Sequence, residues 1–370
     1  MSGRCPVVVA AGGTGGHLFA AAALSHALAA RGMEVHLITD ERGAKYGGDF
    51  PAHAIHKVAA ATPSSGAFFP RATAIFTLIR GTVAARRLVK RIRPRAVIGF
   101  GGYPTVPPLL AATQLRVPTL LHEGNAVIGR ANRFLAGKVD AIAKGFEALG
   151  GLPGTLAAKT HLTGNPVRPL VIEAARVAFP DCPGGKLRIL VTGGSQGAAI
   201  FSGIVPDAIE LMPKAARQRL IIVQQARAED EERVRDTYRR LGVEAEVRSF
   251  FSDLPGRIAQ AHLVIARAGA STVSELAVIG RPAILVPLPH ALDQDQAANA
   301  KQFAATGAAI VVAQSAISPQ WLATALVEAQ GDMASLARRA AAAKQAGIAD
   351  AAERLADLVQ SLMSDKDKKP

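Results

Sequence analysis

The sequence of 370 residues has few cysteines, few aromatic side chains and no long apolar run. Its two cysteines, Cys5 and Cys182, lie far apart and outside any metal-ligand spacing, which argues against a disulfide framework and favours a reducing compartment. No apolar stretch approaches the roughly 18 residues that span a bilayer, and the first residues do not resemble a secretory signal. We therefore expect a cytosolic protein. The phosphate-binding pattern G-x-x-x-x-G-K-[ST] is also missing, which argues against a nucleoside triphosphatase.

Acidic charge is scarce relative to basic charge. The chain carries 43 lysines and arginines against 29 aspartates and glutamates, a formal net charge of +14. Such an excess favours polyanionic partners: nucleic acid, nucleotide phosphates or an anionic membrane surface. The charge alone does not choose among them.

Short apolar runs alternate with amphipathic or alanine-rich segments along the whole chain. This alternation predicts an α/β protein with parallel sheets that are buried on both faces. The proline- and glycine-containing stretch His161–Leu170 separates two halves of similar plan, and the length also favours two domains. The strands are expected at 7–11, 35–39, 96–100, 119–123 and 140–146, and then at 187–192, 220–225, 246–251, 263–269, 283–288 and 309–313. Two helical segments should follow Met333, and the charged end, Ser364–Pro370, is expected to be disordered.

The stretch Val7–His17 consists of the first predicted strand and a glycine turn that precedes a predicted helix. Glycines there let an anion approach bare backbone N–H groups at a helix N-terminus. His17 stands at the mouth of this turn, where an imidazole could accept a proton at neutral pH or merely cap the turn. Leu18 occupies the third position of the dinucleotide-binding glycine pattern, which argues against a dehydrogenase.

Polar side chains also follow other predicted strands of the first half. Tyr103 and Thr105 could offer hydroxyl groups, although they could equally belong to an ordinary loop. His122, Glu123 and Asn125 cluster at the end of a strand, where parallel sheets bind their ligands. A purely structural pairing of His122 with Glu123 stays open.

The second half repeats the theme of strand, glycine turn and helix. Ser195 opens one predicted helix, either as a ligand contact or as an N-cap. Ala270, Ser271 and Thr272 open another, whose N–H groups could hold phosphates, and Glu275 lies one turn in, where a carboxylate could accept from ribose hydroxyls. Asp293 and Asp295 form a D-x-D triplet, but no other metal-ligand cluster accompanies it, so we expect no metal there and favour Gln296 as a hydrogen-bonding partner of sugar hydroxyls.

The stretch Phe68–Ala96 combines apolar and basic residues, and no acidic residue occurs between Arg71 and Arg95. Its apolar residues could belong to the core. A basic face beside an apolar one is also typical of a helix that lies on an anionic membrane.

Together, the motifs GGTGGH, GFGGYPT, HEGNAVIGRANR, GNPVRP, GGSQGA and RAGASTVSEL resemble the MurG family of peptidoglycan N-acetylglucosaminyltransferases. The resemblance covers nearly the whole chain and implies a GT-B fold, two Rossmann-like domains facing a cleft, with the final helix crossing back to the first domain. It implies a membrane- and acceptor-facing domain of residues 1–167 and 346–370, and a UDP-GlcNAc-binding domain of residues 168–345.

The resemblance also implies a reaction. N-acetylglucosamine would move from UDP-GlcNAc to the C4 hydroxyl of MurNAc in undecaprenyl-linked lipid I, with inversion, to form lipid II. The enzyme would lie at the cytoplasmic face of the inner membrane, held through Phe68–Ala96, with no cofactor and no nucleic-acid partner.

Particular residues take roles through the resemblance. His17 is the first candidate for the general base and Glu123 the second, with Tyr103, Thr105 and His122 toward the acceptor. Arg267 would lie near the diphosphate. The other implied donor contacts are Thr14, Gly15, Gly16, Asn125, Arg168, Ser195, Phe251 through its backbone, Ala270, Ser271, Thr272, Glu275 and Gln296. The chain departs from the family pattern at Ala20, at Gly124, where the family commonly has glutamine, and at Gln294 and Asp295.

Three alternatives stay open. The chain could be a UDP-GlcNAc 2-epimerase, or another GT-B enzyme that makes a glycolipid. It could also be a basic membrane- or nucleic-acid-binding protein without catalysis, although such a protein would not need repeated glycine turns at strand ends.

Overall fold

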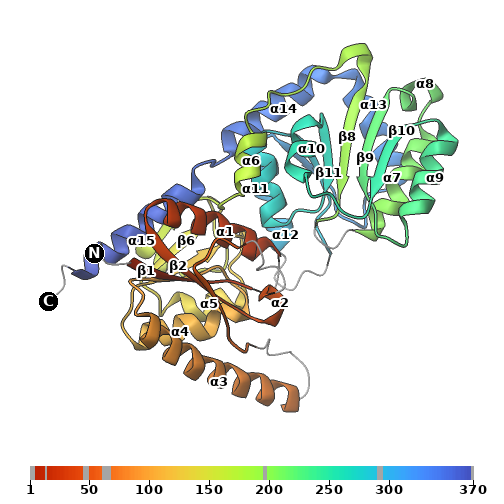
Figure 1. Ribbon diagram of the computed structural model, residues 1–370. Helices are drawn as coiled ribbons and strands as arrows, with labels where there is room; N and C mark the ends of the chain where they lie inside the picture. The colour runs from red at the N-terminus through yellow and green to blue at the C-terminus, as the bar shows by residue number, and fades with distance from the viewer. Residues whose placement is uncertain are drawn as a thin grey trace. The chain divides into compact units, whose positions relative to one another are not determined.

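The computed structural model describes residues 5–12, 15–44, 50–60, 68–194, 198–289 and 295–367. The chain divides into a first unit, Met1–Arg168 with Ala349–Pro370, and a second unit, Pro169–Ile348. Each unit contains one parallel sheet with helices on both faces (Figure 1). The predicted fold class, an α/β chain of two Rossmann-like units, is confirmed.

The sheet of the first unit has the order β3-β2-β1-β4-β5-β6-β7. Its strands are β1 (Cys5–Ala10), β2 (Met33–Thr39), β3 (Ala54–Lys57), β4 (Val97–Gly99), β5 (Thr119–Glu123), β6 (Ala141–Lys144) and β7 (Thr160–Leu162). The strand order reverses between β1 and β4, where Val8 pairs with Val97. In a parallel sheet the carboxyl ends of the strands at such a reversal form the ligand-binding edge.

Helices cover both faces of this sheet. They are α1 (Gly15–Ala30), α2 (Glu41–Ala44), α3 (Phe68–Ile92), α4 (Val106–Gln114), α5 (Arg130–Ala136) and α15 (Ala351–Asp367). Strand residues alternate between the faces, so Val7 and Val9 pack with α1 and α15 while Val8 packs with α3, α4 and α5. Both faces of β1 are therefore apolar, which explains its uninterrupted run of valines.

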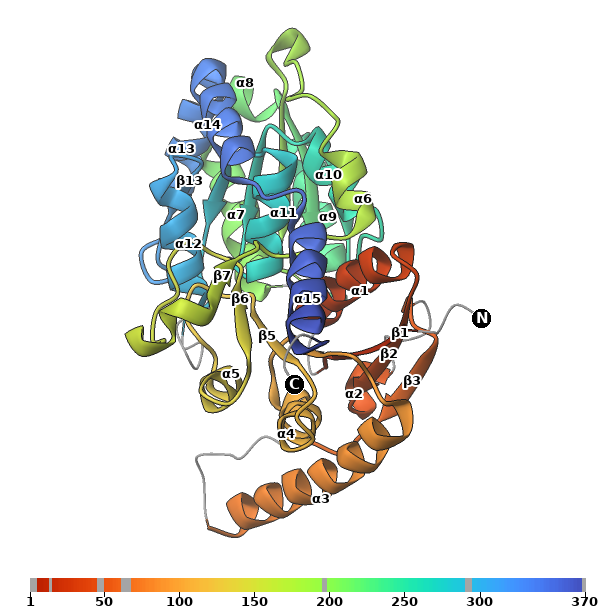
Figure 2. The ribbon, with the colours of Figure 1, turned by 90° about the vertical axis from the view of Figure 1, so that its left-hand side faces the viewer.

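Helix α15, from the far end of the chain, packs beside α1 in the first unit (Figure 2). Leu355, Ala356 and Val359 are fully buried in the same core cluster as Val7. Arg31, the residue after α1, bonds to three side chains of α15, including Asp357 at 2.7 Å. The expectation that the chain is disordered from Ser364 is wrong as far as Asp367, because the helix continues to that residue. Lysines and aspartates continue a helix that packing has already nucleated.

The second unit has a sheet of order β10-β9-β8-β11-β12-β13, which reverses between β8 and β11. Its strands are β8 (Leu187–Thr192), β9 (Leu220–Gln225), β10 (Glu244–Arg248), β11 (Leu263–Ala266), β12 (Ala283–Leu285) and β13 (Ala309–Val311). Its helices are α6 (Pro169–Ala174), α7 (Ala199–Leu211), α8 (Lys214–Arg217), α9 (Glu231–Leu241), α10 (Leu254–Gln260), α11 (Ala270–Ile279), α12 (Asp295–Ala305), α13 (Pro319–Gly331) and α14 (Met333–Ala346).

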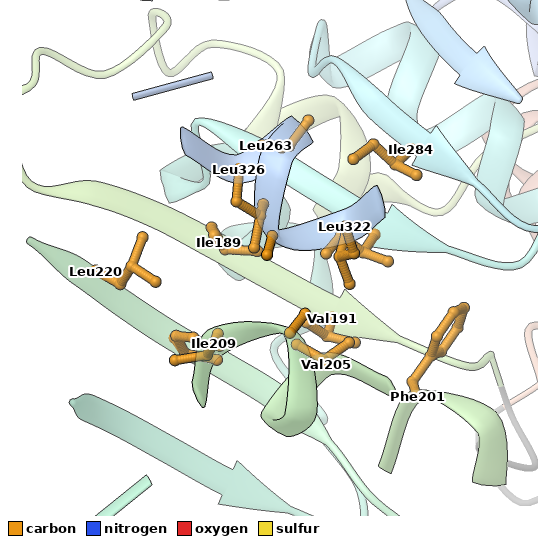
Figure 3. Packing of buried hydrophobic residues seen from close by; sticks show 14 of the residues in the cluster. Ile189, Val191, Phe201, Val205, Ile209, Leu220, Leu263, Ile284, Leu322 and Leu326 are labelled. Carbon is orange, nitrogen blue, oxygen red and sulfur yellow. The ribbon is translucent and has the colours of Figure 1, made fainter. Parts of the chain in front are cut away.

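One face of this sheet packs against α7 and α13. Figure 3 shows Phe201, Val205 and Ile209 of α7 and Leu322 and Leu326 of α13 lying against side chains of β8, β9, β11 and β12. The strand residues in this layer include Ile189 and Val191, two positions apart, as the alternation of a strand requires. Burial of this apolar layer holds β8 in place, and the glycine turn after β8 is thereby anchored.

Candidate active site

In the first unit, two turns meet at the carboxyl ends of β1 and β4. His17 lies in the first turn of α1, and its Nδ1 is 3.3 Å from the carbonyl oxygen of Gly12. Gly101 and Gly102, after β4, have φ values of 89° and 72°, a region that favours glycine. A Cβ on Gly101 would lie 3.4 Å from His17 Nε2, so the imidazole lies directly against this second turn.

The contact with Gly12 selects a tautomer of His17. A carbonyl oxygen can only accept, so Nδ1 carries the hydrogen in this contact and the lone pair of a neutral ring lies on Nε2. A general base needs such a lone pair. The role of His17 as general base stays a prediction.

Glu123, at the end of β5, is almost completely buried and accepts hydrogen bonds on both carboxylate oxygens. Its Oε1 accepts from the backbone and side-chain nitrogens of Asn125 at 3.0 and 3.3 Å. Its Oε2 accepts from Gly129 N at 2.9 Å and from Asn132 Nδ2 at 2.8 Å. The carboxylate therefore organises the loop that leads from β5 into α5.

His122, the residue before Glu123, is also buried. Its pKa is lowered to about 4, chiefly by burial and to a smaller extent by repulsion from His17, while a hydrogen bond to the carbonyl oxygen of Gly164 at 3.2 Å acts in the opposite direction. At neutral pH the ring is uncharged and donates to this carbonyl through Nε2. The neighbouring Glu123 is not its hydrogen-bond partner in this arrangement, because the ring points to Gly164 instead.

The other predicted residues of the first unit lie around the same turns. Gly15 begins α1, and the guanidinium of Arg168 lies 4.5 Å from the ring centre of Phe19 on that helix. Thr105 is fully buried and its hydroxyl donates to the carbonyl oxygen of Gly102 at 2.8 Å, so it shapes the turn. Tyr103 is half-buried in the same turn.

In the second unit, Gln225 ties together the segments after β8 and β10. Its side-chain oxygen accepts from Thr192 Oγ1 at 2.9 Å and from Gly193 N at 3.2 Å. Its side-chain nitrogen donates to the carbonyl oxygen of Ser249 at 3.2 Å. The glycine turn after β8 and the segment that carries Phe251 are therefore fixed relative to each other. Thr14 and Ser195, two of the predicted donor contacts, lie outside the described residues.

Helix α11 begins at the carboxyl end of β11, next to the strand reversal. Its N-cap is Gly269, and within the described part of the chain no side chain caps this end. The first backbone N–H groups of an α-helix have no acceptor within the helix. Those of Ala270, Ser271 and Thr272 therefore point out of the N-terminal end of α11, where an anion could bind. Glu275, one turn further, is buried.

Arg267 precedes this helix, and its guanidinium braces the following loop. It donates to the carbonyl oxygens of Val286 and Pro287 at 3.0 and 3.2 Å and to Gln314 Oε1 at 2.6 Å. Burial lowers its pKa from the ordinary value for arginine. The side chain keeps its positive charge at neutral pH beside the N-terminus of α11.

Gln296, on α12, forms hydrogen bonds with the segments that follow β11 and β12. Its Oε1 accepts from Ala268 N at 3.3 Å and from Leu288 N at 3.0 Å. Asn299, one turn later, donates to the carbonyl oxygen of Ala268 at 3.1 Å and is fully buried. The predicted sugar contact thus lies on the same edge as the N-terminus of α11.

The D-x-D triplet falls partly outside the described residues, which exclude Asp293 and Gln294. Asp295 begins α12, where its Oδ1 accepts from Gln296 N at 2.9 Å. In the part of the chain that the structure describes, no three histidine, cysteine, aspartate or glutamate side chains converge as metal ligands.

Asn132, Gln225 and Asn299 were not predicted as site residues. Asn132 was visible in the motif HEGNAVIGRANR, but its contact with Glu123 spans nine residues. Gln225 is a polar residue at the end of an apolar strand, a signal that could have singled it out. Asn299 lies one helical turn after Gln296, on the same side of α12.

Two Rossmann-like units, each with a glycine turn or helix N-terminus at its strand reversal, are typical of the class of enzymes that act on nucleotide sugars. Residues 7–144 match the glycosyltransferase family 28 N-terminal domain, and residues 188–355 match the family 28 C-terminal domain. The chain belongs to glycosyltransferase family 28.

Curated relatives indicate which members of family 28 this chain is similar to in sequence. A protein of Sinorhizobium fredii (strain NBRC 101917 / NGR234) is 55% identical over 358 residues, which cover 97% of this chain and 95% of the relative. A protein of Methylorubrum populi is 56% identical over 355 residues, 95% of this chain and 96% of the relative. Both are named UDP-N-acetylglucosamine--N-acetylmuramyl-(pentapeptide) pyrophosphoryl-undecaprenol N-acetylglucosamine transferase.

Solved structures agree. The crystal structure of Acinetobacter baumannii MurG has a TM-score of 0.78 and 30% identity, and the match covers 96% of this chain and 99% of that one. A UDP-GlcNAc 2-epimerase from Neisseria meningitidis has a TM-score of 0.67 at 14% identity, which is a likeness of fold alone. The resemblance to the MurG family is therefore confirmed, and the epimerase alternative has less support.

Proposed function

We propose that the chain transfers N-acetylglucosamine from UDP-GlcNAc to the C4 hydroxyl of MurNAc in undecaprenyl-linked lipid I, with inversion, and so forms lipid II. The observation that carries this proposal is identity of about 55% over nearly the full length of relatives named for this transfer. The reaction would supply the disaccharide unit of peptidoglycan.

The donor would bind mainly to the second unit. The diphosphate would lie at the N-terminus of α11, where backbone N–H groups and the helix dipole favour negative charge, with Arg267 nearby. Glu275 would accept from the ribose hydroxyls. Gln296 would donate to the sugar through its side-chain nitrogen, because its oxygen already accepts from two backbone N–H groups. Departure of UDP would then be assisted by fixed dipoles and a cation.

His17 is the better candidate for the general base. Its contact with Gly12 places the ring hydrogen on Nδ1, so in a neutral ring Nε2 is the nitrogen that carries the lone pair a base needs. Glu123 is the poorer candidate, because four N–H groups already occupy its two oxygens. We assign Glu123 to holding the loop 124–129 and the start of α5.

Helix α3 would place the enzyme on the membrane. Ala74, Gly81, Ala85 and Val89 are buried, while Phe76, Ile79 and Val83 are 60%, 57% and 48% exposed. Along the same outer stripe, Arg86, Arg87 and Lys90 continue toward the C-terminal end. An apolar stripe that continues into a basic one suits the interface of an anionic bilayer. Figure 2 shows α3 along one edge of the first unit. Across the described residues, none of the helices has the length and apolar character that a bilayer crossing requires.

The transfer is tested with radiolabelled UDP-GlcNAc in the presence and absence of lipid I. Label that enters the lipid only when lipid I is present supports the proposal, whereas conversion to UDP-ManNAc without lipid would support an epimerase. For the base, His17→Ala should lower kcat by at least about 100-fold, the contribution typical of general base catalysis. A variant in which only KM changes would remove His17 from that role.

The membrane assignment is tested by flotation with vesicles that contain anionic phospholipid. The double variant Phe76→Ser, Ile79→Ser should lose vesicle binding. The matched control is Leu211→Ser, which replaces a 53% exposed leucine on the second unit and should bind normally. Equal binding of all three proteins would contradict the proposed surface.

A further inference from the structure

The two phenylalanines after β10 lie in different surroundings. Phe250 is 67% exposed, whereas Phe251 is 6% exposed. The guanidinium carbon of Arg257, on α10, lies 4.2 Å from the centre of the Phe251 ring. At this distance an arginine is attracted to the face of an aromatic ring, so the stack favours one position of Phe251.

The guanidinium of Arg257 is itself fixed by two carboxylates. Nη1 and Nη2 donate to the two oxygens of Glu246 at 2.6 and 3.2 Å, and Nε donates to Asp253 Oδ1 at 2.8 Å. These bonds raise the pKa of Arg257 and lower the pKa of both carboxyl groups. A bidentate pair sets the plane of the guanidinium as well as its position. The face presented to Phe251 is therefore set by β10 and by the start of α10.

The backbone before Phe251 is held from the opposite direction. Gln225 donates to the carbonyl oxygen of Ser249 and accepts from Gly193 N, which belongs to the glycine turn after β8. The backbone of Phe251 thus lies between two attachments, the buried amide of Gln225 and the stack on Arg257. Movement of this residue requires that at least one of them breaks.

We infer that Arg257 is a positioning residue that holds the Phe251 backbone for recognition of the donor's nucleobase. The inference rests on the proposed function and on the contact of the Phe251 backbone with the donor's uracil that the family resemblance implies. One residue offers one N–H donor and one carbonyl acceptor, which match O4 and N3–H of uracil. Cytosine reverses both groups, so a backbone in fixed position rejects it, because mismatched polar groups stay unpaired. Arg257 therefore contributes to selectivity for uridine over cytidine nucleotides without touching the base.

The experiment measures the affinities of UDP and CDP by calorimetry on the full chain, which needs no lipid acceptor. Arg257→Ala should weaken UDP binding about three- to tenfold, the range expected for loss of one cation–π stack, and should lower the UDP/CDP affinity ratio. Arg257→Lys should recover part of the loss. The control is Arg239→Ala, which removes a 72% exposed arginine that pairs with Asp236 on α9, and it should leave both affinities unchanged.

A second variant separates positioning from general destabilisation. Phe251→Leu keeps the backbone but removes the ring, and the double variant Phe251→Leu, Arg257→Ala should be no worse than Arg257→Ala, because both changes break the same stack. An unchanged UDP/CDP affinity ratio in Arg257→Ala would overturn the inference. A ratio that falls by the same amount in any variant with an equally lowered melting temperature would overturn it too. A wild-type chain that binds neither nucleotide would instead refute the proposed function.

Discussion

Acidification should weaken the first unit through one buried imidazole, that of His122. In the folded chain its pKa is about 4, against an ordinary value of 6.5, chiefly because burial disfavours the charged ring. The unfolded chain therefore binds this proton below about pH 6.5, whereas the folded chain binds it only below about pH 4. The free energy of unfolding must fall as the pH is lowered through this window, and the loss must level off below it.

The size of the effect follows from the two pKa values. One pKa unit corresponds to about 1.4 kcal/mol, so the full difference is worth about 3 kcal/mol, of which about 2 kcal/mol should be lost between pH 7.5 and pH 5. The matched variant is His122→Gln, whose amide nitrogen can still donate to the carbonyl oxygen of Gly164 but does not titrate. It should lack this part of the pH dependence.

The assay is urea unfolding of both proteins at pH 7.5 and pH 5. Unfolding is monitored by hydrogen exchange in peptides from residues 119–144, which report on the first unit. His56 and His262 also have lowered pKa values through burial, but both proteins contain them, so their contribution cancels in the difference. If wild type and His122→Gln lose the same free energy on acidification, the reasoning from burial is wrong.

Three further changes test other parts of the structure. Glu123→Gln turns an acceptor oxygen into a donor that faces N–H groups, so the free energy of unfolding in urea should fall by about 2 kcal/mol. A variant as stable as wild type would contradict the role of Glu123 in holding its loop. Arg281 is buried and donates to the carbonyl oxygens of five residues, among them Ala259, so Arg281→Met should destabilise the second unit by at least about 3 kcal/mol. Trp321 fluorescence during thermal unfolding checks this, with partial recovery expected for Arg281→Lys. Gly12→Ala would place a Cβ 2.9 Å from Asp40 Oδ1, so kcat/KM in the lipid I assay should fall at least about tenfold. The control is Gly203→Ala, whose Cβ meets no described atom within 4 Å, and this variant should be active.

The sequence predicted best where a strand contains a short apolar run. The bounds of β5 and β9 match the predicted runs 119–123 and 220–225, because apolar residues in the sheet interior mark both strands. Strands β3 and β7 were missed. Both lie at sheet edges, and β3 is Ala-Ile-His-Lys, a segment with no buried residue. The predicted strand 246–251 extends too far, because β10 ends at Arg248 and Phe251 belongs to the loop beyond it.

The sequence predicted which strand ends carry the site but not the hydrogen bonds that connect them. Glycine turns and the polar residues after them follow from local sequence, and the parallel sheet brings their ends to one edge of each unit. The contacts that fix them join distant residues, such as Gln225 with Gly193, separated by 32 positions. Such contacts depend on side-chain packing across strands, which the pattern of a single sequence does not contain.

The return of α15 to the first unit affects how the chain can fold during synthesis. Leu355, Ala356, Val359 and Met363 complete a core whose other buried members come from the first 143 residues. A nascent chain that has left the ribosome as far as Arg168 therefore exposes the apolar face that α15 will cover. The second unit, although synthesised later, contains all of its own strands and can complete its core first. The N-terminal half must wait for the last helix, so a stop codon shortly before Ala351 should leave the first unit prone to aggregation while the second unit folds.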